Sequence, residues 1–337
     1  MKEKSIKLFK TKFSRVHELA EKFGLSSCSM GLSKERVLVI SKNKIEKEYP
    51  LTQNISPFFF NPKKEEWKKF TGTTKKPDLK KLRILTWNVL FDFYDKELIQ
   101  TEFRIPEIFK ILKESKSEII ALQEVTVPFL NLLLKEEWIK KKYLISDIDG
   151  STLDPYGVLL LSSIPLDSVI FKKFSEKSKP MVSGFFKFNE KSFGISILHL
   201  PSDKTNEPEK KREILLKQAI GILKEVENTL IVGDFNYGEK EEYLYSPIYQ
   251  DTYKDLYRVK NPKEQGFTYD PSINITANIT SSKLISKRLD RILMKNSEKF
   301  EIGDVNLIGT ESFFVEKKNC LLHPSDHFGL FTTLIEK

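Results

Sequence analysis

Four short segments of the chain carry the kinds of side chain that cleave phosphate esters. They are Thr86-Trp87-Asn88, Leu122-Gln123-Glu124, Gly233-Asp234-Phe235-Asn236 and Ser325-Asp326-His327. Each segment adjoins an apolar run that predicts a buried strand. Carboxylate, amide and imidazole groups at strand ends are what a divalent-cation site for phosphate-ester cleavage requires. The four segments therefore indicate an enzyme.

Glu124 and Asn88 are candidate ligands of the cation. Glu124 follows an apolar run, so we expect its carboxylate at the carboxyl end of a strand, where it can hold a hard cation such as Mg²⁺. Asn88 ends a second predicted strand in the same way, and its amide can orient a cation or a phosphate oxygen. A Gln-Glu pair after a strand also fits an ordinary surface position, and this alternative stays open for the segment taken alone.

Asp234 and Asn236 are candidates for the reaction itself. Gly233 lets the backbone turn sharply after the run Leu230-Ile231-Val232, which directs both side chains to the same side. Asp234 could take a proton from an attacking water, and Asn236 could donate to phosphoryl oxygens as charge develops. An ordinary turn is the alternative, because glycine, aspartate and asparagine favour turns.

Among the four histidines of the chain, His327 has the context of a catalytic group. It follows Asp326, so the pair can supply a cation-directed oxygen and an imidazole that stabilises or protonates a phosphoryl group. Asp290 could orient this imidazole and raise its basicity, although its flanking arginines could instead make it an ordinary ion-pair partner. His199 closes another predicted strand, where a half-buried structural histidine is common.

Composition excludes several classes of protein. With 337 residues, 39% of them apolar, the chain can form one large domain, or a large and a small one. No stretch approaches ~18 uninterrupted apolar residues, and the N-terminal residues lack the apolar segment of a secretory signal, so we expect no membrane span and no secretion. Cys28 and Cys320 match no metal or disulfide pattern, which favours an intracellular compartment, cytoplasmic or nuclear.

The positive charge of the chain is concentrated near its N-terminus. Residues 1–80 contain 19 Lys+Arg and 9 Asp+Glu, whereas the whole chain has a net charge of +9. Such a segment can add electrostatic attraction to a polyanion such as nucleic acid. A solvated lysine-rich surface explains the same composition, because the lysines alternate with glutamates.

Hydrophobic periodicity predicts alternating strands and helices after a polar stretch at 61–81. Strands are expected at 36–40, 83–87, 118–122, 157–161, 184–188, 193–198, 229–232, 290–294 and 328–334. Helices are expected at 11–24, 104–113, 128–141 and 208–228. This pattern predicts an α/β layered fold of two packed sheets with helices outside. The polar stretch predicts a boundary between a small basic N-terminal module of unknown role, 1–76, and a catalytic domain, 81–337.

Taken together and in order, the polar segments resemble the endonuclease/exonuclease/phosphatase superfamily. It includes deoxyribonuclease I, apurinic endonucleases, tyrosyl-DNA phosphodiesterase 2, nocturnin-like deadenylases and inositol 5-phosphatases. The resemblance covers about residues 81–337 and implies a four-layer α/β sandwich, in which two packed mixed sheets are flanked by helices. It also implies hydrolysis of a phosphoester with Mg²⁺ or Mn²⁺ as cofactor.

The resemblance assigns roles to the cation ligands and to the groups that act on water. Glu124 resembles the main cation ligand, with Asn88 and Asp326 nearby. Asp234 resembles the residue that activates water, and Asn236 resembles its helper in the transition state.

The histidines receive roles in the same way. His199 and His327 resemble the phosphate-contacting histidines of the superfamily, and Asp290 resembles the partner of His327. His199 stands where apurinic endonucleases carry a tyrosine, which argues against that branch.

One branch of the superfamily resembles this chain over further segments. The run Gly266-Phe267-Thr268-Tyr269-Asp270 and the later run Arg288-Leu289-Asp290-Arg291 look like tyrosyl-DNA phosphodiesterase 2 and its relatives. This similarity implies that Tyr269 lies beside the scissile group, where it could stack on a base, and that Arg288 contacts substrate.

Two departures from that branch concern the substrate. The tyrosyl-phosphodiesterase pattern has an acidic residue two positions after the asparagine, where this chain has Leu90. Asn-x-Leu is closer to the deadenylase-like branch. An arginine expected soon after Asn236 is replaced by Tyr237-Gly238-Glu239. Both departures concern the 5′-tyrosyl substrate and leave the core chemistry in place.

These segments together predict a Mg²⁺-dependent phosphodiesterase that acts on the ends of nucleic acids, with DNA or RNA as its partner. An RNA 3′-exonuclease of the deadenylase-like kind is the alternative, and an inositol-phosphate phosphatase is less favoured. A nucleic-acid-binding protein with an inactive site is a further alternative, which the complete set of polar residues disfavours.

Overall fold

The computed structural model describes residues 6–8, 26–30, 37–41, 51–71, 79–175 and 178–337. Near the N-terminus, β1 (Ile6–Leu8), β2 (Ser26–Met30) and β3 (Val37–Ser41) form a three-stranded sheet in the order β1-β3-β2. The strand predicted at 36–40 corresponds to β3. The helix predicted at 11–24 lies outside the described residues.

The larger of the two main sheets has nine strands among the described residues. Its path is β17-β21-β7-β8-β10-β9-β5-β6, and β18 pairs with β21. The bounds are β5 Phe58–Asn61, β6 Glu66–Lys69, β7 Leu82–Asn88, β8 Ile119–Val125, β9 Leu144–Ile145, β10 Gly157–Ser162, β17 Phe300–Ile302, β18 Asn306–Ile308 and β21 Gly329–Glu336. Only β7 and β8 run parallel within it, so the sheet is mixed.

The second main sheet has seven strands in the order β15-β16-β14-β13-β12-β11-β4. Their bounds are β4 Leu51–Ile55, β11 Leu166–Lys173, β12 Met181–Phe188, β13 Lys191–His199, β14 Asn228–Asp234, β15 Tyr253–Asp255 and β16 Asp290–Lys295. It is also mixed, with β13 parallel to β14 and β14 antiparallel to β16. A separate hairpin consists of β19 (Phe313–Val315) and β20 (Cys320–Leu322).

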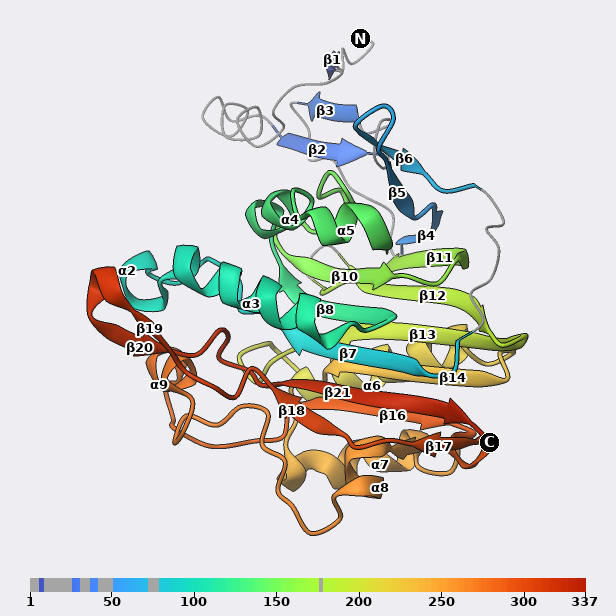
Figure 1. Cartoon of the computed structure of the whole chain (residues 1–337), viewed down its shortest axis with the longest axis vertical. Coiled ribbons are helices and arrows are strands. Elements are labelled where there is room, and N and C mark those ends of the chain that lie inside the picture. The colour runs from blue at the N-terminus through green and yellow to red at the C-terminus, as the bar shows by residue number, and fades with distance from the viewer. Residues whose placement is uncertain (1–5, 9–25, 31–36, 42–50, 72–78, 176–177) are drawn as a thin grey trace.

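Helices cover the outer face of each sheet, as Figure 1 shows. Over the nine-stranded sheet lie α3 (Thr101–Ser115), α4 (Val127–Leu133) and α5 (Glu137–Lys142), and over the seven-stranded sheet lie α6 (Pro208–Ile222) and α7 (Glu242–Tyr249). Among the described residues, the remaining helices are α2 (Lys96–Ile99), α8 (Leu256–Lys260) and α9 (Ile275–Thr280), with single 3-10 turns η2 (Glu239–Glu241), η3 (Ser297–Lys299) and η4 (Glu316–Lys318). The expected four-layer α/β sandwich is confirmed.

The layers are held together because the central strands are apolar on both faces. In β8, Ile119 and Ala121 join the core between the sheets, whereas Ile120 and Leu122 join the core under α3, α4 and α5. Successive side chains of a strand point to opposite faces, so a continuous apolar run fills both cores. This explains why the sequence of the central strands shows continuous apolar runs and no alternation of apolar and polar residues.

Most predicted elements are present, and the differences occur at their ends. The strands predicted after residue 81 are all observed. The helix predicted at 128–141 is two helices, α4 and α5, because the chain turns at Leu134 to Glu136 between them. The helix predicted to end at 228 ends at Ile222, as Asn228 already begins β14.

The predicted boundary between a module at 1–76 and a domain at 81–337 is wrong for residues 51–70. In the structure β4 pairs with β11 at the edge of the seven-stranded sheet, and β5 pairs with β9 in the nine-stranded sheet. Leu51 and Ile55 face the core between the sheets, and Phe58 is 7% exposed in the helix-side core. The alternating pattern of 51–55 is the weak signal of an edge strand.

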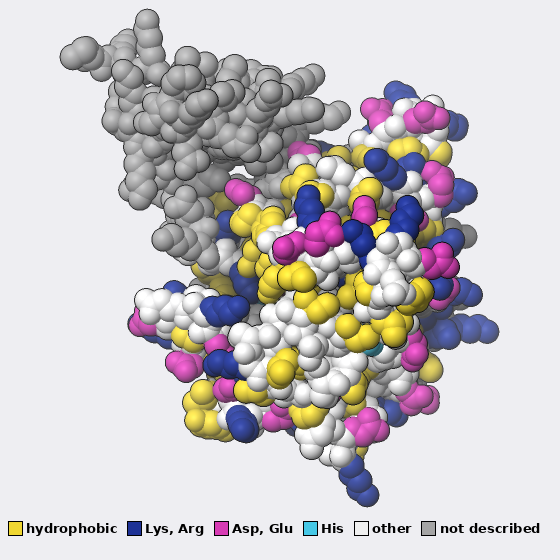
Figure 2. Space-filling model, turned by 90° about the vertical axis from the view of Figure 1, so that its left-hand side faces the viewer, with side chains coloured by type: hydrophobic (Ala, Val, Ile, Leu, Met, Phe, Trp, Pro, Cys, Tyr) yellow, Lys and Arg dark blue, Asp and Glu magenta, His cyan; other side chains and the backbone are white. Residues whose placement is uncertain are grey.

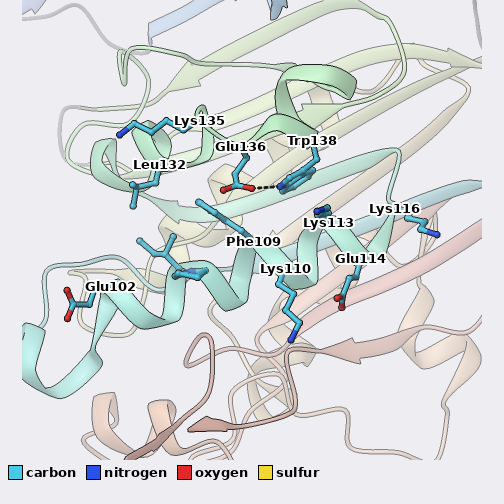
Figure 3. A pocket seen from close by; sticks show the side chains of 12 residues that line it. Glu102, Phe109, Lys110, Lys113, Glu114, Lys116, Leu132, Lys135, Glu136 and Trp138 are labelled. Carbon is cyan, nitrogen blue, oxygen red and sulfur yellow. Dashed lines mark hydrogen bonds between the residues drawn. The ribbon is translucent and has the colours of Figure 1, made fainter. Parts of the chain in front are cut away.

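A groove of about 800 Å³ lies on the outer face between α3 and the α4–α5 pair (Figure 3). Phe109, Leu132 and Trp138 line it together with lysines, and the Trp138 indole donates to Glu136 Oε2 over 2.9 Å. None of the residues predicted for the site lines this groove. Within the described residues, none of the helices is long and apolar enough to cross a membrane.

The integration of residues 51–70 into the sandwich can be tested with Phe58→Ala. We expect the free energy of unfolding of the whole sandwich to fall by about 3 kcal/mol, because a buried phenylalanine is truncated in a shared core. Phe314→Ala, at a position that is 54% exposed, should change it by less than ~0.5 kcal/mol. Denaturant unfolding followed by tryptophan fluorescence measures both. If Phe58→Ala left the main unfolding transition unchanged, residues 51–70 would belong to a separate module.

Candidate active site

The register of the strands brings the polar segments to one edge of the sandwich. In the nine-stranded sheet Asn88 lies opposite Gln123 across the parallel pair β7–β8. In the seven-stranded sheet Asp234 lies opposite His199 on one side and opposite Asp290 on the other. The ends of β7 and β14 meet across the two sheets, because the Asn88 amide donates to the Asp234 carboxylate. Figure 2 is a view onto this side of the molecule, where hydrophobic side chains gather at the surface and a histidine lies among them.

Unusual backbone conformations redirect the chain at these strand ends. Glu124 and Asn236 have φ angles of +60° and +54°, in the left-handed region that non-glycine residues rarely adopt. Gly233 has φ +129°, and a Cβ there would lie 2.0 Å from the carbonyl oxygen of Leu198. Glycine is therefore required directly before Asp234. Such strain is found where the surrounding structure holds a functional side chain in place.

The Asp234 carboxylate lies at the centre of the site. Its Oδ2 accepts from Asn88 Nδ2 over 3.1 Å and from Asn236 Nδ2 over 3.0 Å, and its Oδ1 accepts from the Asn236 backbone N–H over 2.8 Å. His199 Nε2 is 3.3 Å from Oδ2. Burial raises the pKa of Asp234, which the positive charge of His327 partly offsets. A buried carboxylate with a raised pKa is a stronger base than one in water.

His327 pairs with Asp290 as expected. His327 Nδ1 lies 2.8 Å from Asp290 Oδ2, and Asp290 is fully buried at the start of β16. Burial alone would lower the pKa of His327, but Asp290, with Asp234 and Asp326 nearby, raises it well above its usual range. This shift favours the protonated, positively charged ring. It can donate to an anionic phosphoryl oxygen through its other nitrogen.

The pKa of His199 shifts in the opposite direction to that of His327. Burial, together with the positive charges of Lys179 and His327, holds its pKa well below the usual range. The ring is neutral, and its Nε2 also lies 3.7 Å from Glu124 Oε1. The structure thus brings both predicted histidines into the site, one neutral and one charged.

Glu124 and Asp326 have the donor atoms for a hard cation. Glu124 Oε2 accepts from the Phe91 backbone N–H over 3.0 Å, and Asp326 Oδ2 accepts from Thr280 Oγ1 over 2.9 Å. Burial and the nearby Asp326 raise the pKa of Glu124 to about 7. Two buried carboxylates that repel one another, each with lone pairs to spare, fit a divalent cation.

The third expected ligand, Asn88, is engaged elsewhere. Its amide nitrogen donates to Asp234, and its amide oxygen accepts from the Leu90 backbone N–H over 3.1 Å. In this arrangement Asn88 orients Asp234. The amide oxygen of Asn88 retains one lone pair for a cation.

A different group of donors also meets the geometry of a cation site. Among the described residues, ligand atoms of Asp234, Asp290 and His327 lie within 4.8 Å of one another. The hydrogen bond between His327 and Asp290 already occupies Nδ1, and an imidazolium repels a cation. We therefore place the candidate cation site at Glu124 and Asp326.

Two basic residues of the site have no signal in the sequence. Lys179, just before β12, contacts His199 Nε2 through its Nζ and donates to the Leu200 carbonyl over 3.1 Å. Burial lowers its pKa to about 8, although Asp234 and Glu124 oppose this shift. Nothing distinguishes Lys179 in sequence among 56 Lys and Arg residues.

The second is Arg104, which is fully buried in α3. Its guanidinium donates to the carbonyl oxygens of Ile99, Val89 and Pro324 over 2.7, 3.3 and 2.8 Å. It thereby joins the segment after Asn88 to the segment before Asp326.

The expected substrate contact of Arg288 is not supported. Arg288 is 0% exposed, and its guanidinium pairs with Asp255 and, over 3.1 Å, with Glu242. Burial would lower its pKa, but these carboxylates raise it above the usual value. The ion-pair alternative thus applies to Arg288, which holds β16 against β15 and α7. Asp290 itself pairs with His327.

Tyr269 lies where a base could reach it. Its ring centroid is 5.3 Å from that of His327, at an interplanar angle of 59°, and the side chain is half-buried. Its role remains an expectation from sequence resemblance.

Comparison with known proteins gives one family. The model of the "Endonuclease/Exonuclease/phosphatase family" matches residues 85–327, which contain every residue predicted for the site. A search of curated proteins found no match.

Solved structures share the fold. A D. rerio TDP2 complexed with single strand DNA product has a TM-score of 0.61 and 19% identity, over 75% of this chain and 98% of that one. A truncated Caenorhabditis elegans TDP2 has a TM-score of 0.58 and 20% identity, over 76% and 98%. The Bacteroides thetaiotaomicron mannosyl-6-phosphatase Bt3783 has a TM-score of 0.56 and 15% identity, over 75% and 99%.

The lowered pKa of Lys179 predicts an alkaline limit to activity. Lys179 is charged below its pKa of about 8 and neutral above it, so kcat/KM for an anionic substrate should fall as the pH rises through about 8. A cation at Glu124 would move this fall to lower pH. Lys179→Arg should remove the fall, because a guanidinium stays charged. Lys179→Met should lower kcat/KM by roughly 10- to 100-fold at pH values where Lys179 is charged, and the difference from the wild type should shrink as the pH rises through about 8. A pH profile that is the same for all three proteins would contradict a role for this charge.

Arg288→Met should affect stability and leave substrate binding alone. Removing Arg288 leaves Asp255 and Glu242 with the longer contacts to Arg291, at 3.8 and 3.9 Å, and breaking a buried ion pair costs about 3–5 kcal/mol of unfolding free energy. The measurement is denaturant unfolding alongside KM at low temperature, where the variant is folded. A raised KM without loss of stability would restore the substrate contact.

Proposed function

Because the chain belongs to the endonuclease/exonuclease/phosphatase family, we propose that it is a divalent-cation-dependent phosphodiesterase acting on the ends of nucleic acids. The observation that carries this proposal is the convergence of Glu124, Asp234, Asp326 and the His327–Asp290 pair at one edge of the sandwich. Mg²⁺ or Mn²⁺ suits the carboxylate oxygens of Glu124 and Asp326, which are near enough to raise the pKa of Glu124.

The residues of the chain divide the reaction between them. A cation at Glu124 and Asp326 would polarise the phosphoryl group and stabilise the leaving oxygen. Asp234, oriented by Asn88 and Asn236, takes the proton of the attacking water.

The developing negative charge on the phosphoryl oxygens is held by other groups. The His327 imidazolium donates to one of them, and Asn236 and the neutral His199 are near enough to Asp234 to face the same group. The Lys179 ammonium adds positive charge beside His199. His327 keeps its bond to Asp290 while its other nitrogen donates, whereas Asn236 must release its bond to Asp234 or to the Leu200 carbonyl before its amide can donate to a phosphoryl oxygen.

Two observations support a nucleic acid as the substrate. One of the solved structures that share the fold is a D. rerio TDP2 complexed with single strand DNA product. In this chain Tyr269 offers an aromatic ring beside His327, and aromatic rings bind unpaired bases by stacking.

The position of Leu90 favours an RNA 3′-exonuclease as the second candidate. Where the tyrosyl-phosphodiesterase pattern has an acidic residue, Leu90 is 4% exposed, and its backbone adopts φ +57°. A buried apolar side chain cannot replace a carboxylate at the substrate. A phosphomonoesterase is a further candidate, because the B. thetaiotaomicron mannosyl-6-phosphatase shares the fold.

Asp234→Asn tests the assignment of the base. We expect kcat to fall by about 10²- to 10⁴-fold, since an amide cannot accept the proton of water. The fold should persist, because the amide has the same shape. Asp304→Asn, at an exposed position, is the matched control and should retain full activity. Turnover of Asp234→Asn at the wild-type rate would exclude Asp234 as the base.

The substrate is decided by comparing oligonucleotides in Mg²⁺ and in Mn²⁺. The panel contains a 5′-tyrosyl DNA strand, a 5′-labelled RNA, poly(A) RNA and mannose 6-phosphate. Cleavage of the nucleic acids, abolished by chelation, is the expected result. Activity confined to mannose 6-phosphate would replace the proposed function with that of a phosphomonoesterase.

A further inference from the structure

Four aromatic side chains form a cluster at the mouth of the site. Phe91, Phe93 and Tyr94 follow β7, and Tyr156 directly precedes β10. The rings of Phe91 and Tyr94 are stacked with centroids 5.4 Å apart and an interplanar angle of 8°, and those of Phe91 and Tyr156 are stacked at 5.0 Å and 24°. Phe93 contacts Phe91 at 5.2 Å and Tyr156 at 6.0 Å. We call these four residues the aromatic platform.

The platform leaves large ring surfaces in water. Phe93 is 56% exposed and Tyr94 is 36% exposed. Exposed aromatic side chains that stand alone need no explanation, but four rings in mutual contact around Phe91 and Phe93 form a contiguous apolar surface, which generally marks a binding site. Phe314 and Tyr243 are also exposed, at 54% and 72%, and the described structure shows no ring contact for either.

The platform is attached to the catalytic residues directly. The backbone N–H of Phe91 donates to Glu124 Oε2 over 3.0 Å, and the Tyr156 ring centroid is 6.0 Å from that of His199. Burial, with the nearby charges of Asp326 and Glu124, raises the pKa of Tyr94 to about 12. The hydroxyl of Tyr94 therefore stays protonated at neutral pH. A nucleotide whose phosphate is bound at the catalytic residues would therefore place its base on the platform.

We propose that the aromatic platform stacks an unpaired base of the nucleotide next to the scissile phosphate, so that the enzyme selects single strands and frayed ends over intact duplex. This inference rests on the proposed function and defines the structure of its substrate. Every base has a π-face, so stacking on Phe93 and Tyr94 gives little sequence preference. A base within a duplex is already stacked on its neighbours and is not available to the platform.

The chemistry of the platform favours a base over an aliphatic ligand. Its exposed residues are rings, and ring stacking depends on flat π-surfaces as well as on burial of apolar area. Lys179 contacts His199, whose ring lies 6.0 Å from that of Tyr156, and this positive charge near the platform suits an anionic chain carrying aromatic groups. An aromatic side chain of a protein adduct on the phosphate would meet the same rings, and the experiment separates the two.

The test removes the ring from the enzyme and the base from the substrate, singly and together. The enzyme is the full chain carrying Phe93→Leu and Tyr94→Leu, which keep apolar bulk and lose the aromatic faces. Phe314→Leu and Tyr243→Leu form the matched double control. The substrates are a single-stranded DNA oligonucleotide, the same strand with an abasic tetrahydrofuran residue beside the cleaved phosphate, and the matched duplex.

We expect the double variant to lose about 5- to 150-fold in kcat/KM on the base-bearing strand, which corresponds to the stacking of one base. On the abasic strand the double variant and the wild type should be equal. The control variant should match the wild type on both. With 2-aminopurine at the same position, wild-type enzyme should quench its fluorescence on binding, and the double variant should not.

Equal losses on the base-bearing and abasic strands would overturn the platform, because they would indicate a distorted loop. So would the absence of any loss, or a loss confined to a 5′-tyrosyl strand, which would assign the rings to an aromatic leaving group. In these cases cleavage of oligonucleotides still supports the proposed function. Failure of the wild type to cleave any oligonucleotide overturns both proposals.

Discussion

The packing of two sheets through an apolar core is the constraint on which the site depends. The side chains between the sheets are hydrophobic, among them Ile84, Ile119, Val182, Ile195 and Val232. A polar group without a partner is costly in such a core, so polar side chains can stand only where the strands end. Strands β7, β8, β13 and β14 all end at the same edge. The hydrophobic packing that stabilises the fold thereby also collects the carboxylates and amides.

Collecting these groups creates an excess of negative charge. Glu124, Asp234, Asp290 and Asp326 are all largely buried, and the pKa of Glu124 rises to about 7 as a result. The His327 imidazolium compensates Asp290, and Lys179 lies near Asp234. Glu124 and Asp326 form no ion pair with Lys or Arg in the described part of the chain. A divalent cation would supply the missing charge, which connects the stability of the site to its cofactor.

Local pattern was enough to predict the buried central strands and the polar residues at their ends, but it missed others such as β11. Runs such as Ile119-Ile120-Ala121-Leu122 identify buried strands, and the first polar residue after each run identifies the edge of the sheet. The residues Asp234, Asn236, His199, His327 and Asp290 are adjacent in the structure, and the sequence indicated them because each terminates or begins such a run. The resemblance supplied the pairing of His327 with Asp290, which are 37 residues apart.

Other features depend on distant contacts, and local patterns cannot predict them. Residues 51–55 form an edge strand only because β11 offers a partner. The sequence around Arg288 does not distinguish a substrate contact from an ion-pair partner. The fold does, because it places Arg288 against Asp255 and Glu242. Lys179 is one lysine among many until the fold places it against His199.

Two buried arginines show how the same side chain can serve different ends. Arg288 is surrounded by carboxylates, so its charge is neutralised locally and its effect is to hold β16 in place. Arg104 donates only to backbone carbonyls, so its positive charge is not neutralised by a direct partner and acts on Asp326 and Glu124. Its bonds to the carbonyls of Val89 and Leu90 also hold the segment from which the aromatic platform begins. A single guanidinium thus connects the segment after Asn88 to the segment before Asp326 and anchors the surface proposed to bind the base. The chemistry and the recognition of substrate therefore share one support within α3.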